Sequence, residues 1–178
     1  MFAQLDTKSV YSFMDSVVDL NSYVARAKEL GYQALGLMDR DNLYAAYHFA
    51  QLASRNGLRP LIGMEANLFY EGRKIPFRLL AKNNQGYKNL MKLATELSSG
   101  QREFTYFSDY LNDIALILPS EDWEPGMSLG SEVFIGVRPE DAGKEFDYPV
   151  VPLHTVRYFE NADRSTIQTL HAISQNVS

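Results

Sequence analysis

The chain has 178 residues, of which 46% are hydrophobic, and this is enough to build the core of one domain. It contains no cysteine, which excludes disulfides and thiolate zinc sites and agrees with a reducing, cytoplasmic location. A formal charge of −5 argues against a surface built mainly to neutralise DNA phosphates, and no apolar run is long enough to cross a membrane. We therefore expect a single cytoplasmic domain over residues 1–178.

Strand-like and helical segments alternate along the chain. Apolar runs bounded by turn residues predict strands, and apolar residues at helical spacing predict helices. In chain order we expect a strand over residues 2–10, a helix over 21–30, a strand over 33–38, a helix over 42–56, strands over 60–68 and 74–81, a helix over 84–98, strands over 113–118, 132–137 and 149–154, and a helix over 161–178. This order is typical of an α/β fold rich in parallel strands. A barrel of about seven strands surrounded by helices suits it better than an open sheet, although spacing alone does not decide whether the sheet closes.

Polar side chains gather near the carboxyl ends of the expected strands. Alternation in the first strand places Gln4, Asp6 and Lys8 on one face. The second strand leads directly into Asp39 and Arg40. Because the carboxyl ends of parallel strands meet at one end of a barrel, we expect these side chains to share a cleft.

Five blocks, at 11–16, 27–39, 42–44, 62–65 and 79–90, carry a family resemblance. The most specific block, 79–90, reads LLAKNNQGYKNL, and it matches all nine fixed positions of the twelve-residue pattern LLAKN-x-x-GY-x-NL. In this order the blocks resemble the PHP (polymerase and histidinol phosphatase) domain at the amino terminus of bacterial DNA polymerase III alpha subunits. The resemblance runs from about Phe2 to the last expected helix.

The resemblance implies both a fold and a biological setting. It implies a distorted PHP-type barrel and a parent chain that acts in DNA replication as a DNA-directed DNA polymerase, a nucleotidyltransferase. Residues 1–178 would then be the amino-terminal fragment of that longer chain. In active members of the family, His, Asp and Glu side chains at the strand ends bind divalent metals that generate a hydroxide nucleophile.

This chain departs from the family pattern at almost every position that would bind metal. The three histidines of the first strand are replaced, the histidine after the second strand has become Arg40, a further family histidine falls on Pro76 or near it, and both ligands of the late block are lost. The family glutamate is kept as Glu65. The resemblance thus assigns a degenerate metal cleft to Gln4, Asp6, Lys8, Asp39, Arg40, Glu65, His154, Thr155 and Arg157. We expect no metal, no cofactor and no catalytic residue in this domain.

The replacements also suggest what fills the cleft. An ammonium or a guanidinium group stays protonated near neutral pH and cannot bind a metal ion. We expect salt bridges in place of the metals, with Arg40 or Arg157 paired to Glu65, and with Lys8 paired to Asp6 or Asp39.

Two functions remain open. In the first, the domain is structural or a docking surface: its partners are the remaining domains of the polymerase and a replisome protein such as a proofreading subunit, and DNA is bound by the parent chain. The alternative is a residual metal-dependent phosphoesterase, a 3′-5′ exonuclease or a pyrophosphatase, using Asp6, Asp39, Glu65 and His154 around one metal. A free-standing binding module is a third, more distant possibility. Whether the cleft binds an anion through Lys8, Arg40 and Arg157 is left open.

Other features have less specific interpretations. We interpret His48 and His171 as packing or surface residues, because both lie inside expected helices. The aromatic segment 103–110 packs locally under a loop or docks another domain.

Overall fold

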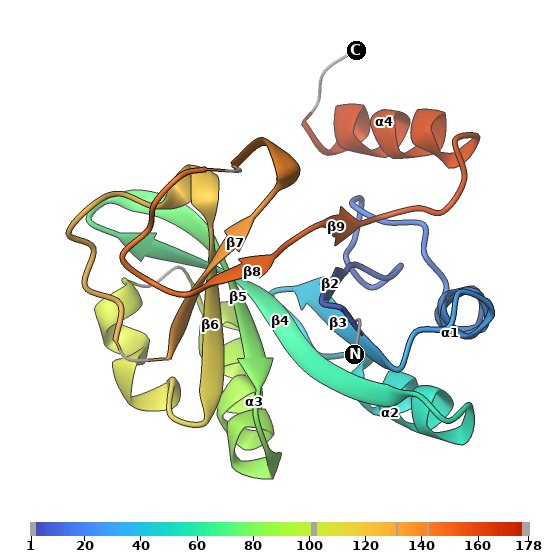
Figure 1. The fold of residues 1–178 in the computed structure, drawn as a ribbon, viewed down its shortest axis with the longest axis horizontal. Helices are drawn as coiled ribbons and strands as arrows, with labels where there is room; N and C mark the ends of the chain where they lie inside the picture. The colour runs from blue at the N-terminus through green and yellow to red at the C-terminus, as the bar shows by residue number, and fades with distance from the viewer. Residues whose placement is uncertain (1–2, 101–102, 131, 142, 176–178) are drawn as a thin grey trace.

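The computed structural model describes residues 3–100, 103–130, 132–141 and 143–175 (Figure 1). Four α-helices, nine strands and three short 3-10 helices lie in these ranges. They are β1 (Ala3–Gln4), β2 (Asp6–Thr7), α1 (Leu20–Glu29), β3 (Ala34–Arg40), α2 (Ala46–Arg55), β4 (Arg59–Tyr70), β5 (Arg73–Ala81), α3 (Asn84–Ser98), η1 (Phe104–Tyr110), β6 (Ile114–Pro119), η2 (Ser120–Asp122), β7 (Val133–Val137), η3 (Pro139–Asp141), β8 (Val150–Pro152), β9 (Thr155–Val156) and α4 (Asp163–Ser174). None of the helices within the described ranges has the length and apolar character needed to span a membrane.

Seven strands form one strongly curled sheet in the order β1-β3-β4-β5-β6-β7-β8. The pairs β1–β3, β3–β4, β6–β7 and β7–β8 are parallel, but β5 is antiparallel to both β4 and β6. This agrees with the expected fold rich in parallel strands, and β5 is the strand that runs against both of its neighbours. The cause is a two-residue hairpin turn at Glu71 and Gly72, which have φ angles of 50° and 79°. Positive φ at both turn residues matches the right-handed twist of the flanking strands.

The two edges of the curled sheet meet at one end, which confirms the expected barrel-like α/β fold. Strand β1 continues past Leu5 into β2, and β8 continues into β9. Strands β2 and β9 pair in parallel, with Asp6 opposite Thr155, and the Lys8 amide donates to the Val156 carbonyl at 2.9 Å. The parallel pairing of β1 with β3 brings the backbone of Leu5 against Gly36, where a Cβ atom would lie 2.0 Å from the Leu5 carbonyl oxygen.

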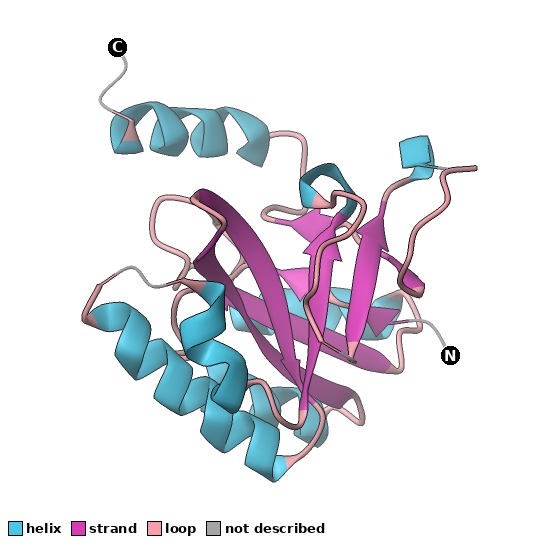
Figure 2. Cartoon of the chain, turned by 90° about the vertical axis from the view of Figure 1, so that its left-hand side faces the viewer, coloured by secondary structure: helices cyan, strands magenta, loops and turns pink. Residues whose placement is uncertain are grey.

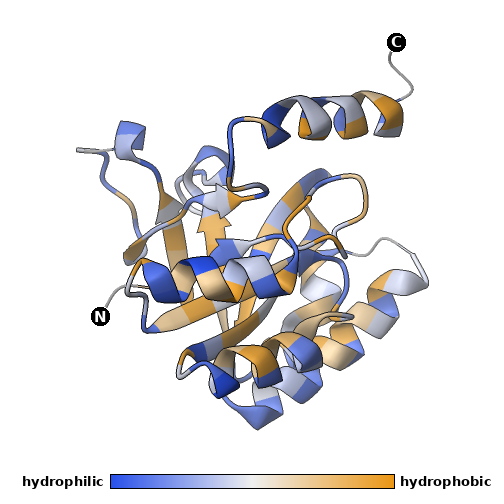
Figure 3. Ribbon diagram, turned by 90° about the vertical axis from the view of Figure 1, so that its right-hand side faces the viewer, coloured by the Kyte–Doolittle hydropathy of each residue, from blue (hydrophilic) through white to orange (hydrophobic). Residues whose placement is uncertain are grey.

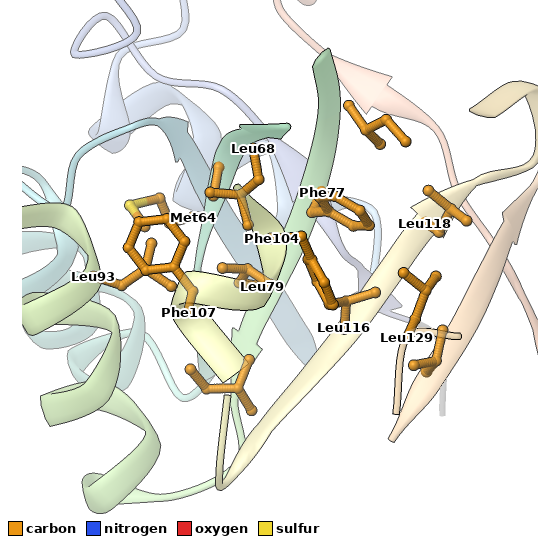
Figure 4. Packing of buried hydrophobic residues seen from close by; sticks show 14 of the residues in the cluster. Met64, Leu68, Phe77, Leu79, Leu93, Phe104, Phe107, Leu116, Leu118 and Leu129 are labelled. Carbon is orange, nitrogen blue, oxygen red and sulfur yellow. The ribbon is translucent and has the colours of Figure 1, made fainter. Parts of the chain in front are cut away.

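Helices cover the outside of this sheet on two flanks (Figures 1 and 2). The larger core lies between β4–β7 and the helices α3 and η1, and Figure 4 shows Phe77, Leu79, Leu93 and Phe107 packed together there. A second core lies between α1, α2 and β3 and contains Phe49. Helix α4 lies apart from the other helices, beyond the end of the sheet where β9 ends (Figures 1 and 3).

The expected elements differ from the observed ones mainly at the two ends of the chain. The first strand was expected to reach residue 10, but strand structure ends at Thr7 and a loop runs from there to α1. The last helix ends at Ser174, and residues 176–178 lie outside the described residues. In the aromatic segment, Phe104 and Phe107 are buried in the core, which agrees with local packing, whereas Tyr106 stays exposed.

Candidate functional site

Residues of β3, β4, β5 and β9, together with η2 and the segments that follow β3, β7 and β9, surround a polar cleft of about 430 Å³. Directly below it, inside the curl of the sheet, lies a small apolar layer built around Met38, Ile117 and Leu153. The cleft is lined by Arg40, Asp41, Glu65, Asn67, Lys74, Pro76, Arg78, Glu121, Arg138, Thr155 and Arg157.

Four charged side chains form a buried ion cluster between the apolar layer and the cleft. The Lys8 ammonium lies 2.8 Å from Asp6 Oδ1 and 2.9 Å from Glu65 Oε2, and it donates to the Met38 carbonyl at 2.6 Å. The guanidinium of Arg78 lies on the same two acids, with Nε 3.0 Å from Asp6 Oδ2 and Nη2 3.2 Å from Glu65 Oε2. The two cations and the two carboxylates balance, so the cluster is electrically neutral as a unit.

Burial makes this pairing obligatory. The side chains of Lys8 and Asp6 are 0% exposed, and that of Glu65 is 3% exposed. Burial by itself raises the pKa of the Asp6 carboxyl, but the charges of Lys8 and Arg78 and the hydrogen bonds it accepts outweigh burial and lower the pKa to about 2. Burial also raises the pKa of Glu65, and the same two cations reverse the shift, so its pKa lies below the ordinary value. Both acids are therefore carboxylates at neutral pH.

A second, outer layer of ion pairs covers the cluster. Arg40 joins the two layers, because its Nε lies 3.0 Å from Glu65 Oε1 and its Nη2 lies 2.7 Å from Asp15 Oδ2. Asp15 Oδ1 also contacts Arg157 Nε and His171 Nε2, each at 2.9 Å. This last contact links α4 to the mouth of the cleft.

Two of the expected ion pairs are present, and two of the alternatives were wrong. Lys8 pairs with Asp6, and Arg40 pairs with Glu65, as expected. Asp39 is not a partner of Lys8, because its carboxylate accepts hydrogen bonds from the Ser9 amide and from the hydroxyls of Ser9 and Ser12, all at 2.7 Å. Arg157 reaches Asp15 in place of Glu65.

The remaining expected site residues lie at the rim of this arrangement. Gln4 donates its side-chain amide to the carbonyl oxygens of His154 at 2.6 Å and of Asp6 at 3.1 Å. Thr155 donates its hydroxyl to Asp6 Oδ2 at 2.7 Å. His154 itself is exposed and does not line the cleft, so the four groups named for a phosphoesterase site do not converge.

Three residues of the network were not anticipated as site residues. Arg78 was missed because the family histidine was placed on Pro76, yet in a strand the residue two positions later lies on the same face, and this alternation was a usable signal. Asp15 lies in a loop with no periodic pattern, so nothing in the sequence identified it. His171 was interpreted as a packing or surface residue; it lies on the surface but also contacts Asp15.

The donor set does not fit the metal cluster that an active family member would carry. Within the ranges 3–100, 103–130, 132–141 and 143–175, no three His, Cys, Asp or Glu side chains are grouped so that they could hold a metal ion. The Asp6 and Glu65 oxygens that face the interior already bind Lys8 and Arg78. A divalent ion would need to displace an ammonium and a guanidinium group that the protein holds in fixed positions.

Comparison with known proteins agrees with this architecture. The model of the PHP domain family matches residues 4–124. The chain belongs to the PHP domain family. The match extends over β1 to η2 and includes the four residues of the ion cluster.

The curated relatives are alpha subunits of DNA polymerase III. The chain is 46% identical over 180 residues to the subunit from Streptococcus pyogenes serotype M1, and the match covers 100% of this chain and 17% of that protein. It is 33% identical over 126 residues to the subunit from Bacillus subtilis strain 168, covering 67% of this chain and 11% of that protein. This PHP domain is thus homologous to the amino-terminal region of these subunits, and the chain spans less than one fifth of their length.

One solved structure aligns with nearly all of the chain. It is a proposed metal-dependent phosphoesterase from Bifidobacterium adolescentis, with 11% sequence identity, a TM-score of 0.46, and coverage of 98% of this chain and 84% of that one.

Proposed function

We propose that this PHP domain is the amino-terminal domain of a replicative DNA-directed DNA polymerase of the polymerase III alpha type. In this proposal the parent chain carries the nucleotidyltransferase activity and binds DNA, and residues 1–178 form one domain of it. The domain itself is structural: it braces the polymerase domains and offers a surface to a replisome protein. The 46% identity over the full length of the chain to a polymerase III alpha subunit supports this placement.

The fully buried Lys8 carries the proposal that the cleft is non-catalytic. Its ammonium bridges Asp6 and Glu65, two of the three acids that the rival phosphoesterase would use to hold a metal ion. With both acids paired internally, no carboxylate of the cluster is free to take a proton from water or to bind an ion that activates water. The cluster holds strands β2, β4 and β5 together at the end of the barrel, which is a structural role.

The rival function, a metal-dependent phosphoesterase, makes a different prediction about metal content. We expect protein purified in its natural polypeptide context and dialysed against zinc or manganese to retain no stoichiometric metal by mass spectrometry. We also expect no hydrolysis of a 3′-ended oligonucleotide or of pyrophosphate above the level of a Glu65→Ala variant. Bound metal together with turnover that disappears in Glu65→Ala would establish the rival and refute a purely structural cleft.

The replication role has its own test. We expect the reading frame to encode polymerase domains after residue 178, and the purified parent chain to extend a primed DNA template. A reading frame without such domains would refute this part of the proposal and leave the fold assignment unchanged.

A further inference from the structure

The mouth of the cleft is rich in positive charge, although the chain as a whole carries a formal charge of −5. Five cationic side chains line it, against three acidic ones; when Lys8, Asp6 and Asp15, which pair with the lining residues from behind, are included, the count is six cations to five acids. The cations are Arg40, Lys74, Arg78, Arg138 and Arg157, and the acids are Asp41, Glu65 and Glu121. An excess of cations in one concave site attracts anions out of proportion to the net charge of the protein.

Lys74 shows most clearly that part of this positive charge is not neutralised by ion pairs within the protein. It lies on β5 two and four residues before Pro76 and Arg78, so all three side chains share the face that lines the cleft. Within the described part of the chain, the Lys74 ammonium has no ion pair and no hydrogen bond. Its three donors are therefore available to a ligand.

Arg40 and Arg157 also have N–H donors that no protein group within the described residues occupies. Arg157 uses Nε on Asp15, and Arg40 uses Nε and Nη2 on Glu65 and Asp15. No contact within the described residues occupies the two terminal nitrogens of Arg157 or Nη1 of Arg40. Because Asp15 anchors both guanidinium groups, their free edges are already oriented and lose little entropy when an anion binds.

Lys8 is not part of this surface. It is fully buried and its three donors are committed to Asp6, Glu65 and Met38. From the sequence, an anion site formed by Lys8, Arg40 and Arg157 was left open. In the structure Lys8 cannot contribute to such a site, whereas Lys74 lines the cleft beside the two arginines.

We propose that the mouth of the cleft is a binding site for a phosphoryl oxyanion, held by Lys74, Arg157 and Arg40 without any metal ion. Planar guanidinium groups bind phosphate oxygens in a bidentate manner, and the ammonium adds a mobile third contact. The volume of about 430 Å³ leaves space for pyrophosphate or for the terminal phosphate of a nucleic acid. The site goes beyond the proposed structural role, and it does not depend on the parent chain being a polymerase.

The test is a calorimetric titration of the protein with inorganic phosphate and with pyrophosphate, in EDTA and at low ionic strength. We expect measurable binding to wild type, with pyrophosphate binding more tightly because it carries more charge. Lys74→Ala should weaken pyrophosphate binding roughly tenfold, the loss typical of one charge-assisted contact. Lys28→Ala, which removes an exposed lysine from α1 on another part of the surface, should leave the affinity unchanged.

A second variant should act in the opposite direction. Glu121 pairs with Arg138 at the rim, so Glu121→Gln removes a negative charge from the lining and frees Nη2 of Arg138, whose Nη1 still lies 3.9 Å from Glu140. We expect severalfold tighter pyrophosphate binding by Glu121→Gln. Thermal unfolding curves of both variants that overlay on wild type would show that the fold is intact; neither residue belongs to the buried ion cluster.

The possible outcomes separate clearly. Competition by a 5′-phosphorylated oligonucleotide, and not by its unphosphorylated form, would identify nucleic acid as the source of the phosphate, whereas failure to compete would identify a free anion. Absence of phosphate and pyrophosphate binding in EDTA, or equal affinity of wild type and Lys74→Ala, would refute the site without touching the proposed replication role. Binding that requires added manganese or zinc would refute both this site and the non-catalytic cleft.

Discussion

Lys8 is an unusual residue, because a buried ammonium is costly unless every donor is satisfied. Its three partners at 2.6 to 2.9 Å satisfy all three donors and neutralise the charge. Such a buried pair contributes little net stability compared with an apolar core, but removing one partner leaves an uncompensated charge. The residue therefore specifies the local arrangement more than it stabilises the fold.

Replacing Lys8 with Met should be strongly destabilising. The change leaves Asp6 and Glu65 buried with too few cations, and we expect the free energy of unfolding to fall by about 3–5 kcal/mol. Urea denaturation at neutral pH measures the effect. The matched variant Lys28→Met, on the exposed side of α1, should change the free energy by less than about 0.5 kcal/mol. A small loss in Lys8→Met would mean that the cluster is not what holds this end of the barrel.

The depressed pKa of Asp6 predicts a specific dependence of stability on pH. The folded pKa of about 2 lies below the ordinary value of 3.8, so the stabilisation is present above pH 3.8 and is lost as the pH falls towards 2. In Asp6→Asn this contribution is absent, and we expect a flatter stability curve between these two pH values. Denaturant titrations at several pH values measure the slopes, with Glu29→Gln on the exposed surface as the control. Parallel curves for wild type and Asp6→Asn would contradict the assigned pKa.

For single residues, the sequence predicted which charged side chains lie in the cleft better than it predicted the ion-pair partner of each one. The positions of Lys8, Asp6, Arg40 and Glu65 could be grouped because strand ends converge. Asp15 could not, because its place depends on a loop that is shaped by hydrogen bonds from Ser9 and Ser12 to Asp39. Loop geometry of this kind depends on contacts 27 to 30 residues apart in the sequence, which no local pattern encodes.

Among the elements, helix α3 has the clearest local signal for its start. Asn83 has extended backbone angles, and its side chain accepts hydrogen bonds from the amides of Gln85 at 2.8 Å and Gly86 at 3.0 Å. This is the arrangement of a helix N-cap, which satisfies amides that have no partner within the helix. The sequence placed this helix correctly at 84–98, and the structure gives the same bounds.

Removing this cap should weaken α3 measurably. We expect Asn83→Ala to lower the free energy of unfolding by about 1 kcal/mol, or somewhat more because Asn83 also donates to Asp113 at 2.8 Å. Chemical denaturation measures the loss. Asn84→Ala, one position later, is a matched control: Asn84 is exposed, makes no hydrogen bond through its side chain within the described residues, and should tolerate alanine. Equal losses in the two variants would show that the cap is not the stabilising feature.

The hairpin between β4 and β5 makes β5 antiparallel to its neighbours in a sheet that is otherwise parallel. Both strands were located from the sequence, within a fold expected to be rich in parallel strands, but the direction of each strand was not assigned. The two-residue connection at Glu71 and Gly72 cannot join parallel strands, which need a crossover of a dozen or more residues. Loop length was thus a better guide to strand direction than the overall pattern.

For the whole molecule, the fold class could be predicted because buried strands and amphipathic helices have distinct periodicities. The closure of the sheet could not be deduced in the same way. It depends on the two-residue strands β2 and β9, which are too short to leave a pattern in the sequence. The resemblance to PHP domains supplied the barrel that periodicity alone left undecided.

Because an ion cluster takes the place of a metal, we expect a chelator to leave the stability of the fold unchanged. We expect the thermal unfolding midpoint of the protein to be the same in EDTA and in buffer with added zinc or manganese, because a ligand that binds only the folded state would raise it. Differential scanning fluorimetry measures the midpoint, and a zinc-dependent protein treated in parallel serves as the control. A lower midpoint in EDTA would reveal a bound ion that contributes to stability.

The pairing of β2 with β9 also constrains how the protein is made. Asp6 leaves the ribosome 149 residues ahead of Thr155, from which it accepts a hydrogen bond. During synthesis the pairing of β2 with β9 must therefore wait until almost all of residues 6–156 have emerged. The barrel can close only after β9 has been synthesised. In a nascent chain stalled before residue 155, β2 has no partner strand and both edges of the curled sheet stay open.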